Sequence, residues 1–160
     1  MNSNSQVDVS YKLSNSLSRL LIELAKDFEK RSLKKCHKRG HTKIRRSHSS
    51  LFSNLGFGAV RLTELAERAG ITQQAMGKLV KEMEQTGYVK RHIDELDKRA
   101  KIIELTELGV NLVNDNMEIV DEVITEYTTA MGQKGIRDLE QILGQSVDAL
   151  GLRESVKQTV

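Results

Sequence analysis

The fold of this chain is decided by residues Leu62–Val89, LTELAERAGITQQAMGKLVKEMEQTGYV. Apolar residues recur at helical spacing in both halves of this stretch, and Gly70-Ile71-Thr72 separates the halves as a tight turn. Thr63 and Thr72 are predicted to cap the two helices, because a threonine hydroxyl accepts backbone N–H groups left unpaired at a helix start. The pattern predicts a helix-turn-helix.

A β-hairpin is expected directly after this motif. Gly87 ends the second helix, and two short runs with strand-like composition follow, Tyr88–Ile93 and Lys101–Leu105. The polar stretch Asp94–Ala100 joins them as a charged tip. A hairpin behind a helix-turn-helix makes a winged helix.

The flanking segments are predicted to be helical. Leucines spaced three and four residues apart predict a helix from about Val9 to about Lys38, and a second, shorter helix runs from about Thr42 to about Asn54. Thr106 caps a long C-terminal helix, which Gly132–Gly135 breaks before a last helix begins near Ile136.

The predicted fold class is mainly α with a small β-hairpin wing. It consists of a winged helix-turn-helix lobe, residues 41–105, and a helical dimerisation region formed by residues 1–40 and 106–160. The apolar stripes of the two C-terminal helices are too wide for one lobe to cover, so the sequence predicts a homodimer.

Composition excludes several classes of protein. Of the 160 residues, 38% are hydrophobic, but no apolar run approaches the roughly 20 residues that span a bilayer. The N-terminus shows no signal-peptide pattern, and the single cysteine precludes an internal disulfide, so a cytoplasmic protein is expected. Phosphate-binding loops and hydrolase or metalloprotease motifs are absent, so neither an enzyme nor a cofactor is predicted.

The small net charge of +3 conceals an asymmetry along the chain. Residues 30–101 contain 18 Lys and Arg against 7 Asp and Glu, whereas residues 102–160 contain 4 against 11. A basic middle indicates a polyanionic partner. The alternative is a scatter of solvated charges, and the acid-free run of residues 30–46 in particular is either a solvated helix end or an extra DNA-backbone patch.

The second helix of the motif carries side chains suited to the major groove of duplex DNA. Gln73, Gln74 and Lys78 form its exposed polar face, and glutamine pairs with adenine while lysine donates to guanine. Gly77 lies between them and allows close approach of the backbone.

Other residues of the lobe are placed for the DNA backbone and the minor groove. Thr72, Lys81 and Thr63, at the start of the preceding helix, are predicted to contact phosphates, which fix the register without recognising sequence. Lys98 and Arg99 at the hairpin tip are predicted to reach the minor groove.

These motifs resemble those of MarR-type regulators. Residues Leu62–Val89 resemble the family's helix-turn-helix, and Asp97–Ala100 followed by Leu105–Gly109 resembles its wing and the start of its dimerisation helix. Arg99 matches the family's wing arginine, and four positions match its base-facing residues: Gln73, Gln74, Gly77 and Lys78. The chain departs from the family pattern at Arg45–Phe52, where many members carry an aromatic and a more apolar stretch.

The resemblance, which covers about residues 11–150, implies a homodimer that binds an inverted-repeat operator in double-stranded DNA. It also implies control by a small-molecule effector, such as a phenol, or by an oxidant or a metal, near the junction of lobe and dimer region. The expected function is a transcriptional regulator, specifically a repressor that the effector releases. The alternative from a different class is a winged helix that docks proteins and does not bind DNA.

Three residues are candidates for sensing a signal. His48 and Phe52 are candidate ligand contacts, although a core histidine with satisfied hydrogen bonds is the plainer interpretation of His48. Cys36 is a candidate redox residue because Lys34, Lys35 and Lys38 would favour its thiolate, and an incidental cysteine is the alternative. Cys36 also neighbours His37 and His41, but the pattern is too sparse to predict a metal site.

Overall fold

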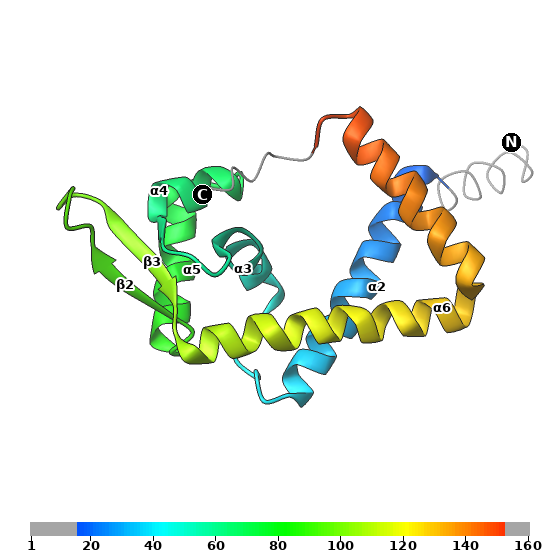
Figure 1. The fold of residues 1–160 in the computed structure, drawn as a ribbon, viewed down its shortest axis with the longest axis horizontal. Coiled ribbons are helices and arrows are strands. Elements are labelled where there is room, and N and C mark those ends of the chain that lie inside the picture. The colour runs from blue at the N-terminus through cyan, green and yellow to red at the C-terminus, as the bar shows by residue number, and fades with distance from the viewer. Residues whose placement is uncertain (1–15, 153–160) are drawn as a thin grey trace, which may run out of the picture.

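The chain folds into five helices, a 3-10 turn and three short strands over residues 16–152, the part that the computed structural model describes. The lobe of small helices and strands lies at one end of two long helices, α2 and α6 (Figure 1). This arrangement confirms the predicted class, mainly α with a small β wing.

The first described helix is α2, Leu17–Lys38. Ser16 adopts an extended conformation and its hydroxyl accepts the backbone N–H of Arg19 at 3.4 Å, so Ser16 is the cap that begins the helix. The predicted start near Val9 lies outside the described residues.

The predicted second helix is shorter than its apolar pattern indicated. Only the 3-10 turn η1, Arg46–His48, and helix α3, Ser49–Leu55, form, and Arg45 before them is extended. Ile44 is nevertheless buried, together with His41. The apolar period therefore continued into an irregular segment that is packed by contacts from distant parts of the chain.

The helix-turn-helix consists of α4, Leu62–Arg68, and α5, Gln73–Gln85. The predicted cap at Thr72 is confirmed, since its hydroxyl accepts the backbone N–H of Ala75 at 3.1 Å. The predicted cap at Thr63 is wrong. Helix α4 starts at Leu62, two residues earlier than a cap at Thr63 would place it, because strand β1, Val60–Arg61, runs directly into it and leaves Arg61 as the extended residue at the N-cap.

The sheet has the order β1-β3-β2 and is antiparallel. Strands β2, Val89–Ile93, and β3, Lys101–Leu105, form the predicted hairpin. Strand β1 was not predicted, because two residues show no alternation. Its Val60 pairs with Ile103, which places the start of α4 against the root of the wing.

One apolar core joins the lobe to the long helices. Met76, Val80 and Met83 of α5 are buried in it together with Ile119 and Val123 of α6. Ala75 is exposed although it is apolar, because the buried face of α5 is centred on Met76.

Helix α6, Glu107–Ala149, is interrupted as predicted. Thr106 caps its start by accepting the N–H of Gly109 at 3.1 Å. Gly132 departs from helical geometry with φ 77° and ψ 159°, and the helix changes direction sharply there (Figure 1). Of the helices in residues 16–152, none combines the length and apolar character needed to cross a membrane.

Gly109 marks the tightest contact between α6 and the lobe. A Cβ atom on Gly109 would lie 2.1 Å from the carbonyl oxygen of Tyr88, whereas one on Gly77 would meet nothing closer than Leu62 Cδ2 at 4.0 Å. We expect Gly109→Ala to lower the free energy of unfolding by about 1–3 kcal/mol, because backbone atoms must move. The matched change Gly77→Ala should raise it by roughly 0.5–1 kcal/mol through better helix propensity. Urea denaturation at one protein concentration measures both, and a Gly109→Ala protein as stable as the parent would contradict the expectation.

Candidate nucleic-acid interface and an adjoining cavity

The face of α5 opposite its buried residues is polar and accessible. Gln73, Gln74, Lys78 and Lys81 are all exposed, while Met76 is fully buried on the other side. The cap at Thr72 is also exposed. This face therefore presents amides and ammonium groups from one rigid element.

Two further predicted contacts lie beside this face. Thr63 is exposed in the first turn of α4. Gly77 is half-buried on α5, and the space beside it would accommodate a Cβ atom without a clash. The protein's own packing therefore does not require glycine at position 77, which agrees with a role in the approach of an external partner.

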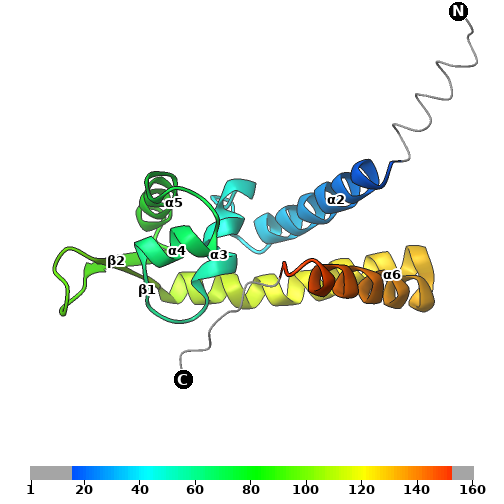
Figure 2. The same ribbon diagram turned by 90° about the horizontal axis from the view of Figure 1, so that it is seen from above.

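The wing projects from the lobe beside α5 (Figure 2). Lys98 and Arg99 are exposed at its tip, and the carboxylate of Asp97 accepts the backbone N–H of Arg99 at 3.1 Å. The N–H of Ala100 donates to the carbonyl of Asp97 at 2.8 Å. The tip is thus a defined turn that holds both cationic side chains outward.

Asp94 fixes the wing to the rest of the lobe, which sequence patterns did not indicate. Its carboxylate accepts the N–H of Leu96 at 2.9 Å and the guanidinium of Arg61 at 2.6 Å and 3.1 Å. These contacts, the Leu96 N–H first and Arg61 second, hold the pKa of Asp94 below its usual value. An Asp directly after a strand is a signal for such a turn, but its partner on β1 is 33 residues away.

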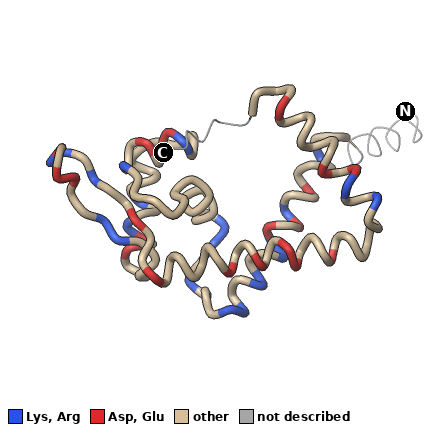
Figure 3. Tube along the Cα trace, in the orientation of Figure 1, with Lys and Arg blue, Asp and Glu red and all other residues tan. Residues whose placement is uncertain are grey.

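Much of the basic segment at the end of α2 is neutralised by α6. Arg31 pairs with Glu126 at 2.8 Å, Lys35 with Glu122 at 2.7 Å, and Arg39 bridges three carboxylates, those of Asp115, Glu118 and Glu122. Figure 3 shows basic and acidic positions close together where the two helices cross. Several cations of residues 30–46 therefore hold α2 to α6, a role that neither interpretation of the sequence included.

His41 connects the lobe to α6. Its Nε2 donates to the carboxylate of Asp115 at 2.9 Å, and its Nδ1 accepts the hydroxyl of Tyr88 at 3.0 Å. The ring is 5% exposed. The bond from His41 is the main reason why the pKa of Asp115 is low, while burial raises the pKa of Tyr88. Tyr88 directly precedes strand β2 of the wing hairpin, so this bond links the wing to the long helices.

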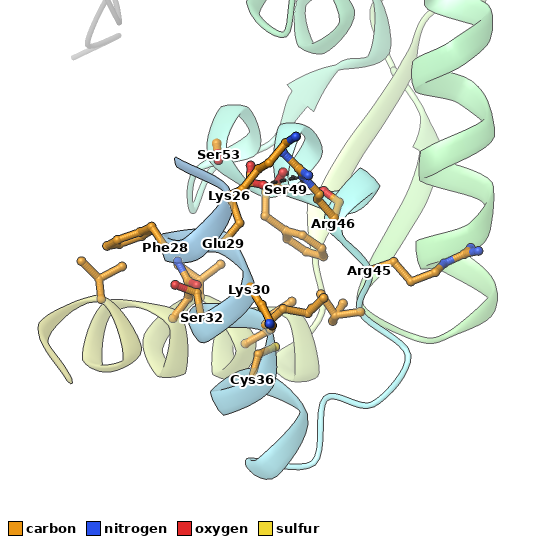
Figure 4. Close-up of a pocket in the computed structure, with 17 residues that line it drawn as sticks. Lys26, Phe28, Glu29, Lys30, Ser32, Cys36, Arg45, Arg46, Ser49 and Ser53 are labelled. Atoms are coloured by element: carbon orange, nitrogen blue, oxygen red, sulfur yellow. Dashed lines mark hydrogen bonds and ion pairs between the residues drawn. The ribbon is translucent and has the colours of Figure 1, made fainter. Parts of the chain in front are cut away.

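A cavity of about 470 Å³ lies between α2, the η1–α3 segment and α6 (Figure 4). Apolar side chains such as Phe28, Phe52 and Leu112 line it, and Cys36 lies at its inner wall. Phe52, one of the two predicted ligand contacts, is among these lining residues. His48 is not among the lining residues.

His48 has both ring nitrogens engaged. Nδ1 accepts the backbone N–H of Arg45 at 3.1 Å, so Nε2 carries the proton and donates to Glu82 of α5 at 3.2 Å. The ring is fully buried. This geometry matches the core-histidine interpretation.

The surroundings of Cys36 differ from those expected of a reactive thiol. Burial, and secondarily the negative charge of Asp115, raise the pKa of Cys36. The neighbouring lysines do not stabilise the thiolate of Cys36 as expected, because Lys35 points to the acidic residues of α6 while Cys36 points inward. His37 donates to the carbonyl of Ile44 at 2.7 Å, and residues 16–152 contain no group of three ligand-type side chains arranged for a metal ion.

Comparison with known proteins agrees with this geometry. Residues 43–100 match the sequence profile of the MarR family. The HTH-type transcriptional regulator SarZ of Staphylococcus haemolyticus is 25% identical over 91 residues, which are 56% of this chain and 62% of SarZ, so the match spans less than two thirds of that regulator.

Solved structures share the fold over most of the chain. Transcriptional regulator Tm0710 from Thermotoga maritima is similar with a TM-score of 0.62 and 23% identity, covering 86% of this chain and 97% of that one. A mutant of MarR from E. coli, crystallised with operator DNA, is similar with a TM-score of 0.67 and 17% identity. The alignment covers 86% of this chain and 97% of the MarR chain.

The Asp94 contacts predict a pH-dependent wing. Because the pKa of Asp94 is lowered in the folded protein, its stabilisation is present above the ordinary carboxyl pKa of about 3.9 and is lost as pH falls through the folded value. Asp94→Asn should remove this dependence, and at neutral pH the Leu96 amide should exchange with deuterium faster while α6 amides are unchanged. Equal protection of Leu96 in both proteins at neutral pH would show that the carboxylate does not hold the wing.

Proposed function

This chain belongs to the MarR family of transcriptional regulators, and we propose that it is a sequence-specific, double-stranded DNA-binding repressor released by a small-molecule effector. The observation that carries the proposal is the one-sided burial of α5, which leaves a polar face beside a basic wing. The family consists of transcription regulators, not enzymes.

In the proposed complex, α5 enters the major groove. Gln73, Gln74 and Lys78 contact base edges, and Gly77 lets the helix backbone come close. Contacts with the sugar-phosphate backbone come from three residues around them, namely Thr63, Thr72 and Lys81. Lys98 and Arg99 of the wing enter the neighbouring minor groove, whose negative potential is strongest where it is narrow.

The functional unit is proposed to be a homodimer. Large apolar side chains remain exposed near the N-terminal end of α2 and after the kink of α6, among them Leu17, Ile22, Ile142 and Leu143. Such a set marks an unfilled interface, and a standard one buries about 1,600 Å². Residues 1–40 and 106–160 are accordingly proposed as the dimerisation region and 41–105 as the DNA-binding lobe. Two-fold symmetry would place two α5 helices about 34 Å apart, matching an inverted repeat.

The cavity supports control by an effector. Its walls belong both to the long helices, through Phe28 and Leu112, and to the lobe, through Phe52. A ligand there would bind the two relative positions of lobe and helices with different affinity, and only that difference can change DNA affinity. Oxidant or metal sensing through Cys36 is less favoured, because a raised thiol pKa leaves little thiolate.

DNA recognition is tested by selecting bound fragments from random DNA and measuring affinity against salt. Lys78→Ala should lose about 1–3 kcal/mol of discrimination between the selected site and random duplex. Arg99→Ala should weaken binding to all sequences and reduce the salt slope by about one. Lys134→Ala, on the far part of α6, is the control and should change neither. Absence of salt-dependent DNA binding by the parent protein would favour the protein-docking winged helix instead.

The dimer is tested with two equally exposed apolar residues. Ile142, which is 62% exposed on α6, lies in the proposed interface, whereas Phe57, which is 61% exposed, lies in the lobe. Ile142→Glu should produce monomers in sedimentation experiments and weaken operator binding, because a buried unpaired charge opposes association. Phe57→Glu should remain dimeric. A dimer of unchanged strength in the Ile142→Glu protein would refute this placement of the interface.

A further inference from the structure

Leu96, at the tip of the wing, is the most exposed large apolar side chain in residues 16–152, with 96% of its surface accessible. Figure 1 shows its loop standing clear of the helices at the end of the β2–β3 hairpin. Within the lobe only Ile93 and Phe57 are comparable, each 61% exposed, and Ile93 also belongs to the wing. Single exposed apolar residues are ordinary, so exposure alone does not indicate a partner. The way in which the backbone presents Leu96 does.

A closed turn holds Leu96 in this position. The N–H of Asp94 donates to the carbonyl of Ala100 at 3.0 Å across the base of the tip, and the N–H of Leu96 donates to the Asp94 carboxylate at 2.9 Å. Arg61 of β1 binds the same carboxylate at 2.6 Å and 3.1 Å. The leucine is therefore presented outward on a hairpin tied to the start of α4. A side chain that is already positioned loses less entropy when a partner buries it.

Two cations stand next to this leucine. Lys98 and Arg99 are exposed, and neither forms an ion pair with a residue in the described part of the chain. Of the carboxylates in the tip, that of Asp94 is paired and that of Asp97 accepts the N–H of Arg99 at 3.1 Å, which leaves Glu95 as the acid without a described partner. The tip therefore combines a protruding apolar group with cations that are free to meet phosphates.

The minor groove of DNA is the surface that suits this combination. Proteins that bind there use arginine and lysine for the groove and insert apolar side chains, leucine among them, between neighbouring base pairs. Leucine has no group that hydrogen-bonds a base edge, so it contributes only by burial. Inserting it costs the unstacking of one base step, and pyrimidine–purine steps unstack most easily.

We propose that Leu96 is an apolar wedge that enters the minor groove and partly unstacks one base step in each half of the operator. This inference rests on the proposed function, which places Lys98 and Arg99 in the same groove. The wedge makes Leu96 a specificity-determining residue, because the cost of insertion depends on the step that is opened. The duplex kinks at that step, and the preferred step is pyrimidine–purine.

The test uses the full chain and the duplex that it selects from random DNA. Adenines of this duplex are replaced one at a time by 2-aminopurine, whose fluorescence rises when the base loses its stacking neighbour. Binding of the parent protein should raise the fluorescence at one step in each half-site, outside the bases that α5 contacts. A bound parent protein that raises the fluorescence at no step would overturn the proposal.

Substitutions at position 96 show whether this side chain opens the step. Leu96→Ser should abolish the rise and weaken binding to the selected site about tenfold, because the burial of one leucine is lost. Leu96→Met keeps an apolar side chain and should retain both. A rise that survives in the Leu96→Ser protein, with its circular dichroism unchanged, would overturn the proposal.

Two matched controls separate the wedge from other effects. Phe57→Ser removes an exposed apolar side chain from the loop between α3 and β1, and Glu95→Gln removes a charge next to Leu96. Both proteins should give the fluorescence rise of the parent. Loss of the rise in both would show that it does not report on Leu96 and would overturn the proposal.

The same measurements distinguish this inference from the proposed function. A parent protein that binds its selected site without unstacking any step overturns only the wedge. A parent protein that binds no duplex overturns the proposed function, and the wedge with it.

Discussion

The structure depends on the burial of one face of α5. Met76, Val80 and Met83 are almost completely enclosed, and burying each such side chain contributes about 1.5–3 kcal/mol. The neighbouring helices and β3 are arranged around these residues in a single core. Because the buried face is fixed, the opposite face is fixed too, so Gln73 and Lys78 point outward as a consequence of apolar packing.

Features set by neighbouring residues were predictable from the sequence. The Thr72 and Thr106 caps, the β2–β3 hairpin and the break at Gly132 each depend on a few adjacent residues whose preferences agree with the fold. Thr63 failed as a cap because β1 pairs with β3, about 40 residues later, and this pairing determines where α4 begins. The segment before Arg46 failed as a helix because distant contacts bury His41 and Ile44 without helical geometry.

The exposure of the α5 face and the wing tip was equally predictable, since amphipathic period and turn composition determine it. The environment of Cys36 could not be predicted from the sequence. Residues adjacent in sequence lie on different faces of a helix, so Lys35 contributes to the α2–α6 ion pairs while Cys36 faces the cavity. The acids that neutralise the basic segment lie some 80 residues away on α6, and a charge count along the chain cannot show which charges meet. The positive surface is consequently smaller than the composition suggests.

The kink at Gly132 determines the direction of the last part of α6, and therefore how that part would meet another copy of the chain. A φ of 77° is available to glycine at little cost, whereas a residue with a Cβ atom prefers the ordinary helical value. With such a residue, the 43 positions of α6 would favour one straight rod of about 65 Å. If the chain forms the proposed homodimer, the terminal arm of such a variant would reach past its own protomer and exchange places with the equivalent arm of another copy, as hinge substitutions do in domain swapping. In the homodimer proposed above, this one glycine would therefore separate a closed pair from an open chain of molecules.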